Sequence, residues 1–201
     1  TSKSRIKECT KLKGQRKGLC QTTLWSRLLL HDIIEFCVDT GLRPCEMKKV
    51  RWSDIDFDNK SVKLYRAGKK QSSRILFVRT IKGIKALKRI KDRRLEYAKI
   101  KDHAFSMGEF VQSYPNGQRI KDPGKGFAEL IKDCGFSYEG HDHQHCMYSL
   151  RHTYATFSLA GINGKRIPIN ALSKQMATSI KMIEQYYGHD DATDYKDFLV
   201  N

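Results

Sequence analysis

Arginines, a histidine and tyrosines recur in this chain at spacings that suit chemistry on a phosphodiester. The segment T-G-L-R-P-C-E contains Arg43, and the segment Y-S-L-R-H-T-Y-A-T contains Arg151 and His152. A third segment, M-A-T-S-I-K-M-I-E-Q-Y-Y-G-H, places Tyr187 at the end of a run with helical spacing. These residue types are the parts from which a metal-free phosphodiester cleavage site can be built.

Such a reaction needs a nucleophile that attacks phosphorus, fixed positive charge on the phosphoryl oxygens, and an acid for the leaving 5′ oxygen. Arginine suits the second role because its planar guanidinium stays charged and binds two oxygens at once. Arg43 precedes Pro44, a residue typical of a helix start, where free backbone N–H groups also favour phosphate. The tyrosine hydroxyl is the candidate nucleophile.

The three segments resemble the characteristic boxes of the tyrosine recombinases, the phage-type integrases. The boxes are T-G-x-R-x-x-E, H-x-L-R-H-x-x-A-T, and a segment that begins L-G-H and ends in the nucleophilic tyrosine. The stretch G-K-K-Q-S-S-R-I-L-F-V, which starts at Gly68, also resembles the family's β-hairpin, whose lysine acts on the leaving group. The resemblance runs from about residue 24 to residue 189.

The resemblance implies a mechanism as well as a fold. Tyr187 would attack the scissile phosphate, form a 3′-phosphotyrosyl link and release a 5′ hydroxyl. Arg43 and Arg151 would hold the phosphoryl oxygens, and Lys69 would be the general acid. Energy is conserved in the covalent link, so we expect no metal, no ATP and no other cofactor.

Two positions depart from the commonest family pattern. Tyr148 stands where many members have histidine, and Thr178, nine residues before Tyr187, stands where many have histidine or tryptophan. Both can donate a hydrogen bond to a phosphoryl oxygen, but neither can supply an imidazolium charge. We place both in the site, with Glu46 and His152 in supporting roles.

Two adjacent tyrosines compete for the role of nucleophile. Tyr186 and Tyr187 point about 100° apart on a helix. Ile183 shares a face with Tyr187, which would suit a core residue. The spacing from Thr178 and the helix-ending Gly188 nevertheless favour Tyr187 as the nucleophile.

A histidine-rich stretch, G-H-D-H-Q-H-C, lies just before the second box. It contains His141, His143, His145 and Cys146, which are zinc ligands by type. Their spacing fits no common structural zinc site, so we expect a polar loop near DNA.

Hydrophobic periodicity predicts a mostly α protein with one small antiparallel β-sheet, an α+β class that matches the fold of tyrosine recombinase catalytic domains. The predicted helices cover residues 22–39, 44–50, 81–100, 127–134, 149–160, 170–176 and 179–187, and the predicted strands cover residues 61–67 and 74–78.

The net charge of +16 on 201 residues indicates a polyanionic partner, nucleic acid first and an acidic membrane surface second. The family resemblance implies that this partner is double-stranded DNA. Residues 1–21 are interpreted as a basic arm or interdomain linker, in which Gly14 and Gly18 break any helix. The resemblance implies that residues 22–201 are the catalytic domain, and we expect the family's N-terminal core-binding domain to be absent from this chain. No apolar run is long enough to cross a bilayer.

The resemblance also implies a homotetramer on DNA, with accessory DNA-bending proteins as further candidate partners, at the nucleoid in the cytoplasm of a bacterium or phage host. The function expected is that of a site-specific recombinase, or integrase. Two alternatives remain open. A type IB topoisomerase would use the same chemistry to relax supercoils, and a catalytically reduced DNA-binding protein would keep the fold alone.

Overall fold

The computed structural model of the chain describes residues 15–65, 73–102, 104–136, 145–162 and 164–187, with the backbone alone for residues 15–22. Lys69, His141 and His143 lie outside these ranges. The helices are α2 (Gln15–Thr40), α3 (Pro44–Met47), the 3-10 helix η1 (Trp52–Asp54), α4 (Ile81–Lys101), α5 (Gly124–Asp133), α6 (Ser149–Ala160), α7 (Ile169–Met176) and α8 (Ile180–Tyr187). The strands are β1 (Ile55–Asp56), β2 (Ser61–Tyr65) and β3 (Ser73–Phe77).

Helix α2 begins earlier than predicted. It starts at Gln15 and passes through Gly18, so the expectation that Gly18 breaks any helix was wrong. A glycine inside a helix costs only about 1 kcal/mol relative to alanine, which a helix of 26 residues can absorb. The helix ends where predicted, at Gly41, whose φ is +66°. A Cβ at Gly41 would lie 2.4 Å from the Tyr154 ring, so glycine also permits the close approach of α6.

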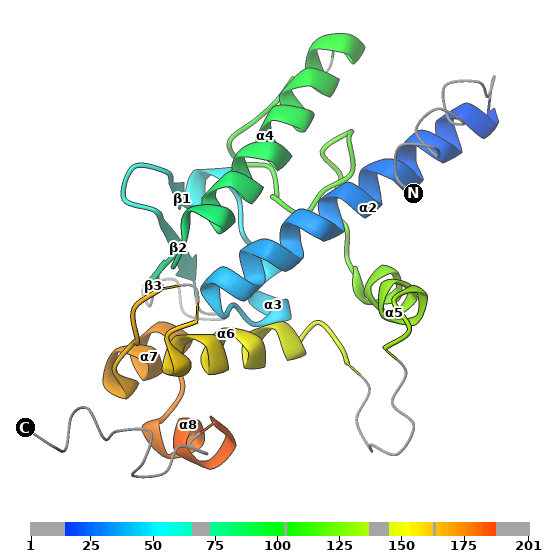
Figure 1. Cartoon of the computed structure of the whole chain (residues 1–201). Coiled ribbons are helices and arrows are strands. Elements are labelled where there is room, and N and C mark those ends of the chain that lie inside the picture. The colour runs from blue at the N-terminus through cyan, green and yellow to red at the C-terminus, as the bar shows by residue number, and fades with distance from the viewer. Residues whose placement is uncertain (1–14, 66–72, 103, 137–144, 163, 188–201) are drawn as a thin grey trace, which may run out of the picture.

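The sheet is antiparallel with strand order β1-β2-β3. Strands β2 and β3 coincide with the two predicted strands, and Val62 faces Leu76 across them. Both of these side chains are buried, so this face of the hairpin closes the core. Strand β1 was not predicted, because two residues are too few to show an alternating pattern. Strand β3 forms one outer edge of the sheet (Figure 1).

The core consists of two hydrophobic clusters. The larger one joins α2, α4 and the sheet. Buried Asp32 of α2 bonds Arg89 and Arg93 of α4, which fixes how the two helices cross (Figure 1). The smaller cluster lies among α6, α7 and α8, and its members are Tyr154, Ala155, Leu172, Met176 and Ile183. This second cluster is what holds the C-terminal helices against α6.

The predicted fold class is confirmed, since the described part of the chain is mostly helical with one small antiparallel sheet. No helix in the described ranges is long and apolar enough to cross a membrane.

Candidate active site

Arg43 lies immediately before α3 and connects the first box to the end of α7. Its backbone N–H donates to one carboxylate oxygen of Glu46 at 3.0 Å, and its guanidinium donates to the other at 3.2 Å. The second guanidinium nitrogen donates to the carbonyl of Ala177 at 2.7 Å. Arg43 is thus held by residues from two distant parts of the sequence.

Glu46 is shared between Arg43 and a second arginine, Arg74 of β3. One guanidinium nitrogen of Arg74 lies 2.9 Å from each carboxylate oxygen of Glu46. Burial alone would raise the pKa of Glu46, but the Arg43 backbone N–H and the Arg74 guanidinium outweigh it and leave the pKa below its usual value. Glu46 therefore stays ionised and keeps both arginines in fixed orientations.

The C-terminal end of α7 offers three successive carbonyl groups to three arginines. The pairs are Arg74 with the Gln175 carbonyl, Arg151 with the Met176 carbonyl at 2.6 Å, and Arg43 with the Ala177 carbonyl at 2.7 Å. The last carbonyls of a helix lack intrahelical partners and form the negative end of its dipole, which favours cations. The same helix end therefore positions Arg43 and Arg151 side by side.

Arg151 is a buried residue of α6, and its guanidinium group links the end of α2 to the end of α7. Besides the Met176 carbonyl it binds the Gly41 carbonyl at 2.7 Å, the residue that ends α2. Burial lowers its pKa, and the charge of Arg43 lowers it further. An arginine remains charged in any protein, so the shift records how closely two cations have been brought together.

Ala177 adopts the left-handed conformation, with φ +48°, at the position where the family box has glycine. This residue turns the chain from α7 towards α8. The backbone N–H of Thr178 then donates to the Ser173 carbonyl at 3.0 Å, which fixes Thr178 at the turn.

A cleft of about 310 Å³ lies between α6 and α8. Its lining residues are Tyr148, Arg151, His152, Met176, Thr178, Met182, Tyr186 and Tyr187. Five of the predicted site residues are among them. The Tyr187 hydroxyl lies 2.6 Å from Nδ1 of His152, and the two rings are 5.3 Å apart between centroids. The Tyr148 ring also contacts His152, with ring centroids 5.2 Å apart.

The cleft perturbs the groups that line it. Burial lowers the pKa of His152, and the charge of Arg151 lowers it further, so the imidazole is neutral at pH 7. Burial raises the pKa of Tyr187. The charge of nearby Arg151 lowers this pKa in part, and Tyr148 raises it further. The phenol is therefore protonated at rest.

Tyr187 and Tyr186 occupy different environments. Tyr187 is half-buried and packs against the smaller hydrophobic cluster. Tyr186 is 53% exposed, although it also lines the cleft. Tyr187 therefore packs against the smaller hydrophobic cluster, as its helical face shared with Ile183 predicts, and also makes a polar contact with His152.

Two residues of this arrangement were missed by the sequence reasoning. Arg74 was seen only as part of the predicted hairpin, although its pairing with inward-facing Leu64 places a cation on the buried face of the sheet. Gln175 gave no signal at all. Its side-chain oxygen accepts from the Phe77 N–H at 3.1 Å, and its side-chain nitrogen donates to the Phe77 carbonyl at 2.6 Å.

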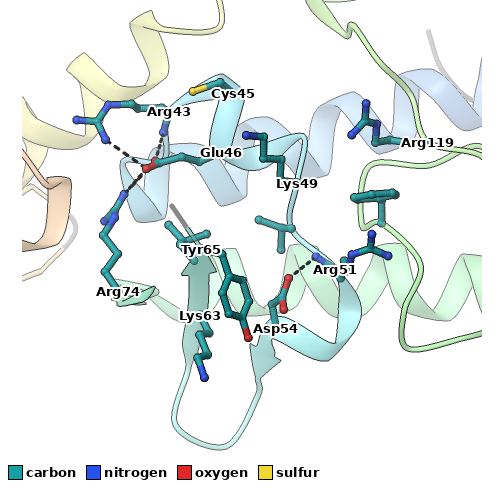
Figure 2. A pocket seen from close by; sticks show the side chains of 13 residues that line it. Arg43, Cys45, Glu46, Lys49, Arg51, Asp54, Lys63, Tyr65, Arg74 and Arg119 are labelled. Atoms are coloured by element: carbon teal, nitrogen blue, oxygen red, sulfur yellow. Dashed lines mark hydrogen bonds and ion pairs between the residues drawn. The ribbon is translucent and has the colours of Figure 1, made fainter. Parts of the chain in front are cut away.

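A second, larger hollow of about 610 Å³ lies beside Arg43, between α3, the sheet and the loop around Phe110 (Figure 2). Its cationic lining residues are Arg43, Lys49, Arg51, Lys63, Arg74 and Arg119. We call this hollow the basic groove. Its two acids are already engaged, Glu46 by the arginine pair and Asp54 by the Arg51 N–H at 2.8 Å. Arg51 and Arg119 both stack on Phe110, at 4.2 and 5.0 Å from the ring centroid.

One group of metal-ligand types, His31, Asp32 and Glu35, comes together within the described residues. Asp32 and Glu35 are already paired with arginines of α4, so this group serves the packing of α2 on α4. His145 and Cys146 precede α6, but their predicted companions lie outside the described ranges.

The fold is that of tyrosine recombinase catalytic domains. XerA recombinase is 20% identical, with a TM-score of 0.60 over 88% of this chain and 64% of its own. A variant of the Tn1549 transposon integrase in complex with transposon right end DNA is 20% identical, with a TM-score of 0.63 over 99% of this chain and 64% of its own. XerH site-specific recombinase bound to difH substrate is 15% identical, with a TM-score of 0.61 over 99% and 52%.

The sequence itself defines the family. The model of the phage integrase family matches residues 16–193, so the chain belongs to that family. The chain spans less than two thirds of the length of the three solved structures named above. No curated protein sequence matches it.

Proposed function

We propose that this chain is the catalytic part of a site-specific recombinase that cleaves and rejoins DNA through a covalent phosphotyrosine at Tyr187. The observation that carries the proposal is the meeting of Tyr187, His152 and Arg151 in one cleft, with Arg43 held beside Arg151 by the end of α7. A phenol, two fixed guanidinium groups and a proton acceptor match the demands of phosphoryl transfer without a metal.

In this scheme the scissile phosphate sits at the cleft, where Arg43 and Arg151 neutralise the charge that develops on its oxygens. Thr178 and Tyr148 donate hydrogen bonds to the same oxygens. Lys69 protonates the leaving 5′ oxygen, a role taken from the family resemblance. The basic groove binds the adjoining DNA backbone, and a 5′ hydroxyl of a second duplex later attacks the phosphotyrosine.

The test is covalent capture of DNA. The chain is incubated with duplexes of randomised sequence, each nicked so that cleavage releases a short fragment and traps the protein on the longer one. We expect an adduct that forms equally well in EDTA, with the DNA attached to Tyr187 in the mapped peptide. Tyr187→Phe should abolish the adduct, whereas its matched control, Tyr186→Phe, should retain it.

The outcomes separate the alternatives. An adduct on another tyrosine would show that the third box has been aligned wrongly. Binding without any adduct would leave the catalytically reduced DNA-binding protein in place of the enzyme. Transfer of the captured strand to a second duplex distinguishes a recombinase from a topoisomerase of type IB, which reseals only the strand it cut. A cleavage step lost in EDTA and restored by a divalent cation would contradict the mechanism.

A further inference from the structure

The contact between α6 and α8 raises a question that the family boxes leave open, namely where the Tyr187 proton goes. A phenol is almost wholly protonated near neutral pH. Its protonated oxygen is a poor nucleophile, and burial in the cleft raises the pKa of Tyr187 further. Within the described residues, the Tyr187 hydroxyl forms a hydrogen bond with Nδ1 of His152 at 2.6 Å.

The other groups in the cleft cannot take up this proton. Among the residues lining it, the titratable ones are Tyr148, which directly precedes α6, Arg151 and His152 on α6, and Tyr186 and Tyr187 on α8. Arginine is always protonated, and a second phenol near neutral pH holds its own proton. Tyr148 moreover stands where many family members carry a histidine, so the usual imidazole is missing at that position.

We infer that His152 is the general base of the cleavage step and accepts the Tyr187 proton at Nδ1. The inference rests on the proposed function. The proton passes from the Tyr187 oxygen to Nδ1 while that oxygen forms its bond to phosphorus. The bond from phosphorus to the 5′ oxygen breaks, and the leaving oxygen takes a proton from Lys69. On rejoining, the attacking 5′ hydroxyl gives its proton to Lys69 as its oxygen bonds to phosphorus, and the imidazolium returns its proton to the departing tyrosine oxygen.

The surroundings of His152 suit this role. Burial and the charge of Arg151 lower its pKa, so the imidazole is neutral and able to accept a proton at pH 7. The role also requires one tautomer, with the resting proton on Nε2 and the lone pair of Nδ1 directed at the phenol. Both helices belong to one chain, so base and nucleophile are paired within the same protomer.

The tautomer can be measured without DNA. Nitrogen-15 spectra of the ring, assigned by comparison with His152→Asn, should show His152 neutral at pH 7 with its proton on Nε2. A proton on Nδ1 would make His152 a donor to Tyr187 and would overturn the inference, whatever DNA the protein cleaves.

The kinetic test uses the duplex captured by the wild-type chain. His152→Asn places an amide near the position of Nδ1, so it can keep a hydrogen bond to Tyr187 but cannot take up the proton. We expect His152→Asn and His152→Ala both to lose about 10²- to 10⁴-fold in the rate of adduct formation, the usual contribution of a general base. Added imidazole should restore part of the rate in His152→Ala.

The pH dependence gives a further readout. The wild-type rate should fall as the pH drops below the ordinary histidine value of about 6.5, and this limb should vanish in His152→Asn. Because the pKa of His152 is lowered, the fall should set in below that value. Near wild-type cleavage by His152→Asn would reduce His152 to a positioning residue. Absence of any adduct in the wild type would instead contradict the proposed function. The tautomer measurement would still show whether Nδ1 of His152 can accept the Tyr187 proton.

Discussion

Arg151 shows how much structure a single catalytic candidate can carry. Its guanidinium binds the carbonyls of Gly41 and Met176, which end α2 and α7, while it also lines the cleft beside Tyr187. A lysine at this position would keep the charge but would lose the planar group that reaches several partners at once. The residue is therefore a structural connector as well as a candidate clamp on phosphate.

For Arg151→Lys we expect two separable losses. Adduct formation should fall by about two to four orders of magnitude, by analogy with removing one donor that stabilises a transition state. The free energy of unfolding should fall by about 1–3 kcal/mol, because a buried carbonyl loses its partner. Rates of adduct formation and thermal melts measure the two effects.

Arg94→Lys is the matched control for Arg151→Lys. Arg94 is also a buried arginine, paired with Glu109 at 2.9 Å, and it lies outside the cleft and the basic groove. Its replacement should lower stability with little effect on the cleavage rate of the folded protein. An Arg151→Lys variant that cleaves at the wild-type rate would make Arg151 a scaffold residue only.

At the scale of elements, the notable connection is between α7 and the free edge of β3. Gln175 pairs with both backbone polar groups of Phe77, as a neighbouring strand would. It also lies near Tyr154, whose pKa is raised by burial and is lowered only in part by Gln175. Gln175 thus ties the predicted hairpin to the helix end that holds Arg43 and Arg151.

Gln175→Leu should break this tie while keeping a side chain of similar size. We expect faster hydrogen exchange at the Phe77 amide and a loss of about 1–2 kcal/mol in stability, since two hydrogen bonds disappear. Cleavage should slow as well. Exchange measured by NMR and adduct formation on the captured duplex test both expectations.

If Gln175→Leu slows cleavage because the proposed acid Lys69 no longer protonates the leaving 5′ oxygen, a sulfur in place of that oxygen should restore the rate. A thiolate leaves without a proton, because the pKa of a thiol is only about 8.5. Gln118→Leu is the control, since Gln118 is exposed and lies outside the cleft and the basic groove. An unchanged rate of hydrogen exchange at the Phe77 amide in Gln175→Leu would show that Gln175 does not hold β3 against α7.

The elements also show what a sequence can and cannot specify here. Periodicity located α4, α6, α7 and both longer strands, because each places apolar residues on one face. It failed at the start of α2, where the helix runs through Gly18, and at β1, which is too short for a pattern. The family boxes predicted Arg43, Arg151 and Tyr187 as site residues. The hydrogen bonds of Arg74 with Glu46 and of Gln175 with Phe77 were not predicted, because they join residues 28 or more positions apart in the sequence.

At the scale of the whole molecule, the main feature is the excess of positive charge. The chain carries a net charge of +16, and the basic groove gathers six cationic side chains beside the cleft. Its acids are satisfied internally, so the groove presents an excess of positive charge to a ligand. Stacking of Arg51 and Arg119 on Phe110 limits the freedom of both guanidinium groups and so reduces the entropy lost on binding.

We therefore expect DNA affinity to depend steeply on salt, because each phosphate neutralised by the groove releases counterions. Binding is measured with Tyr187→Phe, so that cleavage does not perturb the equilibrium. Lys49→Gln and Arg119→Gln should each make the plot of log affinity against log salt shallower by about one unit. Lys99→Gln, which removes an exposed charge of α4 outside the groove, should leave the slope unchanged. A slope that responds equally to all three substitutions would mean that the charge acts diffusely and that DNA does not follow the groove past Arg43.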